Sequence, residues 1–375
     1  MFIFLIPLLF DYALGGIYFI VSYRLAAEGY PAFLSGSPMI VWGISYALSS
    51  IVVGRITTPA NARMLLLLSG VGTVVTSLCF ILFDNVLMQL LWVALMGVVS
   101  AFYCIPFQVF AGSDSVSSRA DKAAALYTFS WSIGTAAGCL GFGSLPEKWA
   151  YTVNVFIGVL MIFLASRASQ PVKKNPENPA EETAYCDQMK SAWVFCGTAA
   201  FAMLMLNALL PWRGVELKLG QFWSGASLAL LRFAQSFSAL ALINARKWMY
   251  GGKALGIAAV LGTGSMIFWT LGRGVFSYMT GAFLFGICAG IIYFSLVYYA
   301  LAVPEKSAKY ISINEILLGL AGIIGPAVGG AATQGFGAVR VFGGCACVLL
   351  AAGVIAQIVL VRERKFFQKE PQERG

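Results

Sequence analysis

The stretch RASQPVKKNPENPAEETAYCDQMK, residues 167–190, is the least hydrophobic internal segment of the chain. It carries three prolines, charges of both signs and almost no bulky apolar side chain. A segment of this kind cannot bury enough apolar surface to offset the entropy lost on ordering, so it is predicted to be a flexible linker. Because it lies near the middle of the 375 residues, the sequence predicts two membrane bundles, 1–166 and 191–361, and a tail at 362–375.

The composition of the whole chain is that of an integral membrane protein. Hydrophobic residues make up 59% of it and charged residues 11%, and the mean hydropathy is +0.81. A soluble domain would carry about twice that charged fraction. The net charge of +9 therefore suits short loops that set membrane topology, and nucleic acid is not an expected partner.

Two residue types limit the chemistry. The chain has no histidine, which excludes His-based triads, haem ligation by histidine and the usual zinc sites. Its eight cysteines include no CxxC pair, so neither a disulfide framework nor a metal site is supported. No cofactor is expected, and the protein is not expected to be an enzyme.

The apolar runs predict an all-α membrane protein with about twelve transmembrane helices in two six-helix bundles. The first run starts almost at the initiator Met, lacks a basic region before it and a small-residue cleavage site, and is therefore interpreted as a retained helix. The predicted spans are 2–23, 37–56, 64–83, 86–111, 123–145, 150–166, 191–212, 222–243, 254–271, 275–303, 310–334 and 338–361.

The basic residues predict which side each loop faces. With the N-terminus inside, 18 Lys and Arg residues fall in the inner loops and the C-terminal tail, against 6 in the outer loops. This is the direction that the positive-inside bias demands. Both termini and the linker are therefore predicted to be cytoplasmic, and the plasma (inner) membrane is the predicted location.

The two halves also resemble each other, which predicts an internal duplication of a six-span unit. Three correspondences occur in the same order with a nearly constant offset. Asn61-Ala62-Arg63 matches Asn244-Ala245-Arg246, Asp121-Lys122 matches Glu305-Lys306, and Gly138 and Gly141 fall opposite Gly322 and Gly325.

The chain resembles the major facilitator superfamily of secondary transporters. The resemblance covers nearly the whole chain in architecture, and two motifs carry it more weakly. Residues 54–63, GRITTPANAR, keep only Gly54 and Arg63 of the family's Gly-x-x-x-Asp-Arg-x-Gly-Arg-Arg loop. Residues 322–330, GIIGPAVGG, look like the family's Gly-Pro-x-x-Gly-Gly motif, here in the eleventh span. The resemblance implies one central site that opens alternately to each side.

Glycines and a proline in the spans predict close helix packing. Gly134-xxx-Gly138, Gly286-xxx-Gly290 and Gly325-xxx-Gly329 have the spacing that lets helix backbones approach. Pro326 removes a helix hydrogen bond, and the resulting kink is either a hinge or a simple bend. The predicted packing and hinge residues are Gly138, Gly322, Gly325, Pro326 and Gly329.

Three charges lie inside spans, where each costs about 2.5–3.5 kcal/mol at the bilayer centre. Asp11 and Arg232 lie near mid-depth, whereas Glu315 is close enough to the cytoplasmic end to reach water. Asp11 and Arg232 form either a buried ion pair that fixes packing, or a proton-accepting carboxylate and a substrate-binding cation. Asp11 and Glu315 are the predicted proton-coupling residues, and Arg232 is a predicted substrate-binding residue.

Neutral polar and aromatic residues gather in the spans that line the cavity of the resembled family, and in their neighbours. The further candidates for substrate binding are Tyr12, Tyr103, Gln108, Trp131, Asn207, Gln235, Tyr293 and Asn314.

The sequence contains no Gly-x-x-x-x-Gly-Lys-Ser/Thr motif for ATP, so a gradient must supply the energy. It predicts a proton-coupled secondary active transporter of a small organic solute that works without oligomerisation in the lipid bilayer. Three alternatives stay open: an efflux pump for amphipathic compounds, an intramembrane enzyme, and a transporter-like sensor or scaffold. The missing histidine counts against the enzyme.

Overall fold

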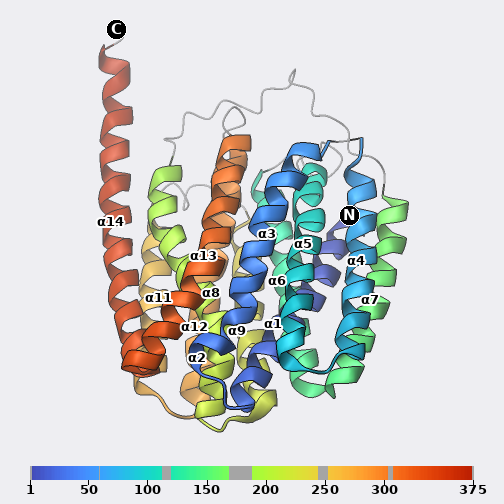
Figure 1. Ribbon diagram of the computed structural model, residues 1–375. Coiled ribbons are helices and arrows are strands. Elements are labelled where there is room, and N and C mark those ends of the chain that lie inside the picture. The colour runs from blue at the N-terminus through green and yellow to red at the C-terminus, as the bar shows by residue number, and fades with distance from the viewer. Residues whose placement is uncertain are drawn as a thin grey trace.

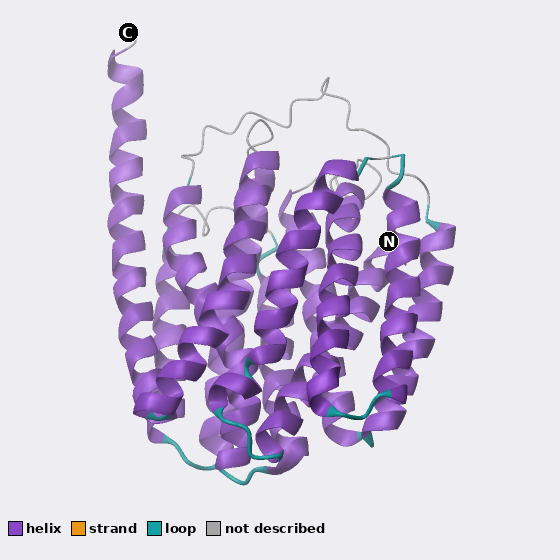
Figure 2. Cartoon of the chain, viewed as in Figure 1, coloured by secondary structure: helices purple, strands orange, loops and turns teal. Residues whose placement is uncertain are grey.

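The computed structural model describes residues 2–58, 60–111, 120–168, 188–243, 252–302 and 307–373. Within these ranges every regular element is a helix (Figures 1 and 2). Besides the short η1 (Phe2–Phe4) and α2 (Ala32–Ser35), there are six long helices before the predicted linker and six after it. They are α1 (Leu5–Ala27), α3 (Ser37–Ile56), α4 (Ala62–Leu82), α5 (Val86–Ala111), α6 (Ala120–Ser144), α7 (Glu147–Arg167), α8 (Met189–Glu216), α9 (Gly220–Ala241), α11 (Lys253–Leu271), α12 (Val275–Ala302), α13 (Ser307–Phe336) and α14 (Ala338–Glu373).

Each long helix coincides with one predicted span. Ten of them are long and apolar enough to cross a membrane by length and composition. The other two, α6 and α9, are of similar length but more polar, and they pack extensively against each other between the two halves. Buried polar residues such as Thr128 and Ser132 on α6 and Ser227 and Ser236 on α9 account for their lower hydropathy. The protein is an integral, multi-pass membrane protein.

The helix pairs of the first half recur in the second. In the first half α1 packs on α6, α3 on α5 and α4 on α7; in the second half α8 packs on α13, α9 on α12 and α11 on α14. Between the halves, α6 contacts α9 and α3 contacts α13. The predicted class, an all-α protein with two six-helix bundles, is confirmed. A superposition of the two halves stays a prediction.

Two of the predicted domain boundaries can be compared with the structure. Most of the predicted linker, residues 169–187, lies outside the described residues, so the linker stays a prediction. At the C-terminus α14 continues as one helix to Glu373, past the end of the apolar run at 361 (Figure 1). Arg, Glu, Lys and Gln are good helix formers, so a helix can outlast the hydrophobic pattern that marks its membrane span.

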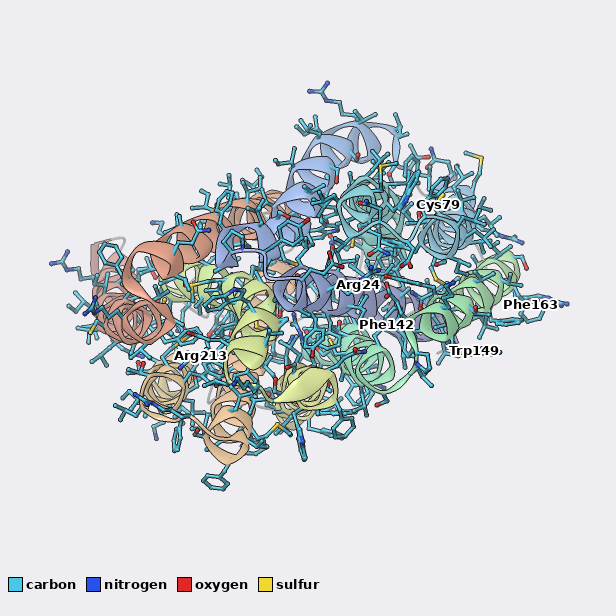
Figure 3. All side chains as sticks on the ribbon, turned by 60° about the horizontal axis from the view of Figure 1, so that its bottom comes forward. Arg24, Cys79, Phe142, Trp149, Phe163 and Arg213 are labelled. Carbon is cyan, nitrogen blue, oxygen red and sulfur yellow. The ribbon has the colours of Figure 1, made fainter. Side chains whose placement is uncertain are left out.

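The helices alternate in direction, which sorts their ends into two groups (Figure 1). Arg55, Arg63, Arg167 and Lys190 lie at helix ends on the same side of the molecule as the C-terminus. The predicted outer residues, including Arg24 and Arg213, lie toward the opposite end, which is turned forward in Figure 3. Among the described residues, these predicted inner and outer basic residues therefore lie at opposite ends of the bundle.

Outward-pointing side chains are mostly large and apolar. Figure 3 shows Trp149 and Phe163 at the periphery of the helices, and 67% and 52% of their surfaces are exposed. Phe276 is exposed to 81%. Lipid can cover such a surface because every long helix satisfies its own backbone hydrogen bonds.

Glycines allow the closest helix contacts. A Cβ atom on Gly134 or Gly138 would lie 2.1 Å from the carbonyl oxygen of Leu8 or Tyr12, so α6 approaches α1 only because both positions lack a side chain. The remaining predicted packing residues lie on α13, which continues through Pro326. A Cβ atom would meet Phe201 at Gly325, Met205 at Gly329 and Trp42 at Gly322. Gly138 thus packs within its own half, whereas Gly322 packs against the other half.

Candidate functional site

A cavity of about 230 Å³ lies between the two halves. The first half lines it with α1, α3, α5 and α6, and the second half with α8, α9, α12 and α13. Among the described residues, none from α4, α7, α11 or α14 contributes to the lining. Eight helices therefore build the site, and α4, α7, α11 and α14 lie outside it.

Nine of the eleven predicted coupling and binding residues line this cavity. They are Asp11, Tyr103, Gln108, Trp131, Asn207, Arg232, Tyr293, Asn314 and Glu315. Tyr12 does not: its hydroxyl and its carbonyl face Gly141 and Gly138 on α6. Gln235 is fully buried behind Arg232 and also lies outside the lining.

Arg232 is buried, with 5% of its surface exposed, and its guanidinium faces the cavity. Nη1 donates to Oε1 of Gln235 at 2.9 Å and Nη2 donates to Oδ1 of Asn207 at 3.2 Å. The guanidinium carbon lies 5.4 Å from the centre of the Trp131 ring, within cation–π range. Gln235 and Asn207 hold the side chain in place with neutral groups.

Arg232 has no ion pair with any carboxylate of the described residues; the described ion pairs involve Arg24 and Arg213. The alternative of a direct Asp11–Arg232 ion pair that fixes packing is therefore not what the structure shows. Asp11 on α1 and Arg232 on α9 instead line the same cavity without an ion pair between them. A buried cation without a countercharge in contact is costly, and such a group inside a membrane protein marks a functional site.

Asp11 lies on the α1 side of the cavity and is half-buried. Its Oδ2 accepts a hydrogen bond from the Tyr103 hydroxyl at 3.3 Å. The Tyr103 ring stacks on Phe10, with centroids 4.2 Å apart, which fixes the hydroxyl beside the carboxylate. Asp11 is thus held by an uncharged donor and keeps its second oxygen free of hydrogen bonds to the described residues.

Glu315 joins the two halves. Its Oε2 accepts from the Tyr46 hydroxyl at 3.0 Å, and its Oε1 accepts from Nε2 of Gln108 at 2.9 Å. Tyr46 is on α3 and Gln108 on α5, whereas Glu315 is on α13. The sequence places Glu315 close enough to the cytoplasmic end of its helix to reach water. In the structure its side chain turns into the cavity, because two donors of the first half meet it there.

Two further predicted residues have partners of their own. Asn314 accepts from Nε1 of Trp193 at 2.9 Å and donates to the Leu296 carbonyl at 3.0 Å, so its amide links α8, α12 and α13. Tyr293 packs its ring edge-on to Trp131, with centroids 5.0 Å apart. Asn314 therefore supports the wall, while Tyr293 is part of its aromatic surface.

Sequence reasoning missed several aromatic lining residues. The largest are Tyr18, Trp42, Tyr46 and Tyr127. Helical spacing could have found two of them, since Tyr18 lies two turns from Asp11 and Tyr127 one turn from Trp131. Tyr18 packs edge-on to Trp42, which stacks on Tyr46 with centroids 4.9 Å apart and planes 5° apart. Together, Tyr18, Trp42 and Tyr46 form one aromatic cluster.

Comparisons with known proteins show a likeness in fold. No protein-family model matches the chain, and no curated protein matches it. Among solved structures, the crystal structure of the human organic anion transporter MFSD10 (TETRAN) matches 94% of this chain and 98% of its own, with a TM-score of 0.70. The chain has the major facilitator fold. The resemblance predicted from the sequence is confirmed in architecture, and at 13% sequence identity the likeness concerns the fold alone.

Proposed function

We propose that the protein is a secondary active transporter that moves a small organic anion by alternating access and couples this movement to protons. The observation that carries the proposal is Arg232, a buried guanidinium that faces the cavity without a carboxylate partner among the described residues. The fold supports it, because the structurally similar human protein is described as an organic anion transporter.

The anion follows from the charge of Arg232. A guanidinium has five N–H donors, and only two here donate to described residues. A carboxylate, sulfonate or phosphate on the solute accepts from such a fork in a bidentate manner and supplies the missing countercharge. Binding then replaces the water that the cavity would otherwise hold around the cation.

Proton coupling follows from the position of Asp11 across the cavity. When Asp11 is ionised, its negative charge competes with that of an anionic solute for the positive charge of Arg232, and this weakens binding of the solute. Protonation removes this competition, so a proton on Asp11 and an anion on Arg232 favour each other's binding. This linkage gives symport of an anion with a proton, and it needs no direct contact between the two side chains.

Alternating access requires a contact between the halves that can break. The hydrogen bonds from Tyr46 and Gln108 to Glu315 are such a contact, which we name the α13 latch. Glu315 accepts both bonds as a charged or a neutral carboxyl, but they are stronger when it is charged. Protonation of Glu315 therefore loosens the latch, which gives the second predicted carboxylate a role in gating.

A second candidate is efflux of amphipathic compounds. Asp11 and Glu315 both face a cavity rich in aromatic side chains, and this combination suits a lipophilic cation. Arg232 opposes such a cargo, which is why we place the anion first. In the third alternative, a non-transporting sensor, loss of Asp11 and Arg232 would be tolerated.

The test is uptake into proteoliposomes. Purified protein is reconstituted and supplied with organic anions or lipophilic cations, with and without an imposed pH gradient. Gradient-driven uptake of an anion that is lost in Arg232→Ala supports the proposal; uptake or release of the cation alone supports the second candidate. Arg340→Ala is the matched control, because it removes an exposed positive charge from α14, away from the cavity.

For the orientation, we propose the plasma membrane with both termini in the cytoplasm. The sorting of Lys and Arg between the two ends of the helices supports this orientation.

A further inference from the structure

The charges that line the cavity limit the solute to one negative charge. Of the described lining residues, Arg232 is the only base, whereas Asp11 and Glu315 are acids. A second carboxylate on the solute would find no cation and would face carboxyl groups. Burying an unpaired charge in this way is costly.

The side chains that line the cavity indicate the chemistry of the uncharged part of the solute. Eight aromatic side chains line the cavity: Tyr18, Phe19, Trp42, Tyr46, Tyr103, Tyr127, Trp131 and Tyr293. Several of them form ring pairs, among them Trp42 stacked on Tyr46 and Tyr293 edge-on to Trp131, so aromatic rings of both halves border the cavity. Aromatic rings attract one another beyond the area that they bury, which favours a flat ring over a flexible alkyl chain.

The volume of the cavity limits the size of the solute. A cavity of about 230 Å³ is smaller than the roughly 300–1,000 Å³ of pockets that hold drug-sized ligands. It accommodates a carboxylate on one ring.

We propose that the solute class is a small aromatic monocarboxylate, with its carboxylate on Arg232 and its ring against the Tyr18–Trp42–Tyr46 cluster. This inference rests on the proposed function, since it narrows the organic anion to one chemical class. The ring lies toward the first half, because the cluster belongs to α1 and α3, and the carboxylate lies toward α9 of the second half.

The experiment compares five compounds by the rise that each causes in the melting temperature of the purified full-length protein, because only a ligand of the folded state raises it. Benzoate carries the proposed features. Cyclohexanecarboxylate has the same charge on a saturated ring, benzamide has the ring without the charge, terephthalate adds a second carboxylate, and benzylamine reverses the charge. The expected result is stabilisation by benzoate well above that by the other four.

The other outcomes separate this inference from the function on which it rests. Equal or stronger stabilisation by cyclohexanecarboxylate or terephthalate overturns the aromatic monocarboxylate and leaves an organic anion transporter standing. Stabilisation by benzylamine or benzamide alone overturns both. No stabilisation by any carboxylate overturns the inference, whereas the function is judged separately by uptake.

A variant pair tests the ring contact. Trp42→Leu should weaken benzoate binding about tenfold but cyclohexanecarboxylate binding only about twofold, because tenfold corresponds to about 1.4 kcal/mol, the size of one aromatic contact. Trp42→Phe should restore most of the loss. The matched control is Trp149→Leu, which removes a tryptophan from the periphery. An equal loss for both ligands in Trp42→Leu would show that the cluster supports the fold and does not recognise a ring.

Discussion

The two halves of the protein give the same cavity two different walls. The first half provides Asp11 and seven of the eight aromatic lining side chains. The second half provides Arg232, two asparagines, Glu315 and a largely aliphatic surface, with Tyr293 as its single aromatic lining residue among those described. The helices pair in the same way in both halves, so the difference lies in side chains carried by equivalent helices.

This difference suggests how a fold whose two halves pair their helices in the same way becomes selective. Equivalent helices keep the close backbone packing that the membrane requires, while the lining residues are free to diverge. Under the proposed function, the second half binds the charged group of the solute, and the first half binds its apolar body and the coupling proton. In the proposed mechanism both halves meet around the solute, which would link its binding to movement of one half against the other.

The largest expected effect comes from the charged wall of the second half. Arg232→Ala should lower anion uptake about hundredfold or more, because removing one partner of a buried charged contact costs about 3–5 kcal/mol. Arg232→Lys should keep part of the activity, since it keeps the charge without the fork. Initial rates of uptake into proteoliposomes measure the effect. Normal uptake in Arg232→Ala would place the anion site elsewhere.

The next effect concerns the acid of the first half. An imposed gradient of one pH unit drives at most about tenfold accumulation for each coupled proton, since one unit corresponds to about 1.4 kcal/mol. Asp11→Asn should abolish this accumulation and leave exchange of internal for external solute largely intact, because a permanently neutral residue passes through the loaded states but cannot couple them to a proton. Unchanged accumulation would remove Asp11 from coupling and make Glu315 the next carboxylate to test.

The fold could be predicted from the sequence, and the site only in part, for a physical reason. A membrane helix must satisfy its own backbone hydrogen bonds, so its length and apolar pattern appear locally in the sequence. The direction in which a lining side chain points depends on how its helix is rotated against neighbours that are distant in sequence. Asp11 faces the cavity while the adjacent Tyr12 faces α6, and Glu315 turns inward because Tyr46 and Gln108 of the other half lie there.

A smaller effect is expected at the α13 latch, where the two walls touch. Tyr46→Phe removes one of the two hydrogen bonds to Glu315 and should favour the state in which the halves have parted. A hydrogen bond to a charged group is worth about 1.5–3 kcal/mol, and because only part of it biases the opening we expect a change of about fivefold. Alkylation of Cys104, which lines the cavity, by a water-soluble maleimide reports this opening when the Cys104 peptide is read by mass spectrometry. Tyr30→Phe, on the opposite end of the bundle, is the control, and an unchanged rate in Tyr46→Phe would reject the latch.

The smallest effect tests whether the aromatic wall also has a polar function. Tyr18 is buried, and its hydroxyl has no hydrogen-bond partner among the described residues although the side chain borders the cavity. A buried hydroxyl without a partner costs about 1–3 kcal/mol, so Tyr18→Phe should leave the melting temperature of the ligand-free protein unchanged or raise it by about 1–2 °C.

If the solute presents a second acceptor to the Tyr18 hydroxyl, Tyr18→Phe should bind a hydroxybenzoate about threefold more weakly and benzoate as before, because only the hydroxybenzoate loses a hydrogen bond. Tyr23→Phe, on the same helix but away from the cavity, should change neither quantity. A lower melting temperature in ligand-free Tyr18→Phe would show instead that the hydroxyl already has a partner within the folded protein, and the wall of the first half would then act on the solute through its rings and Asp11 alone.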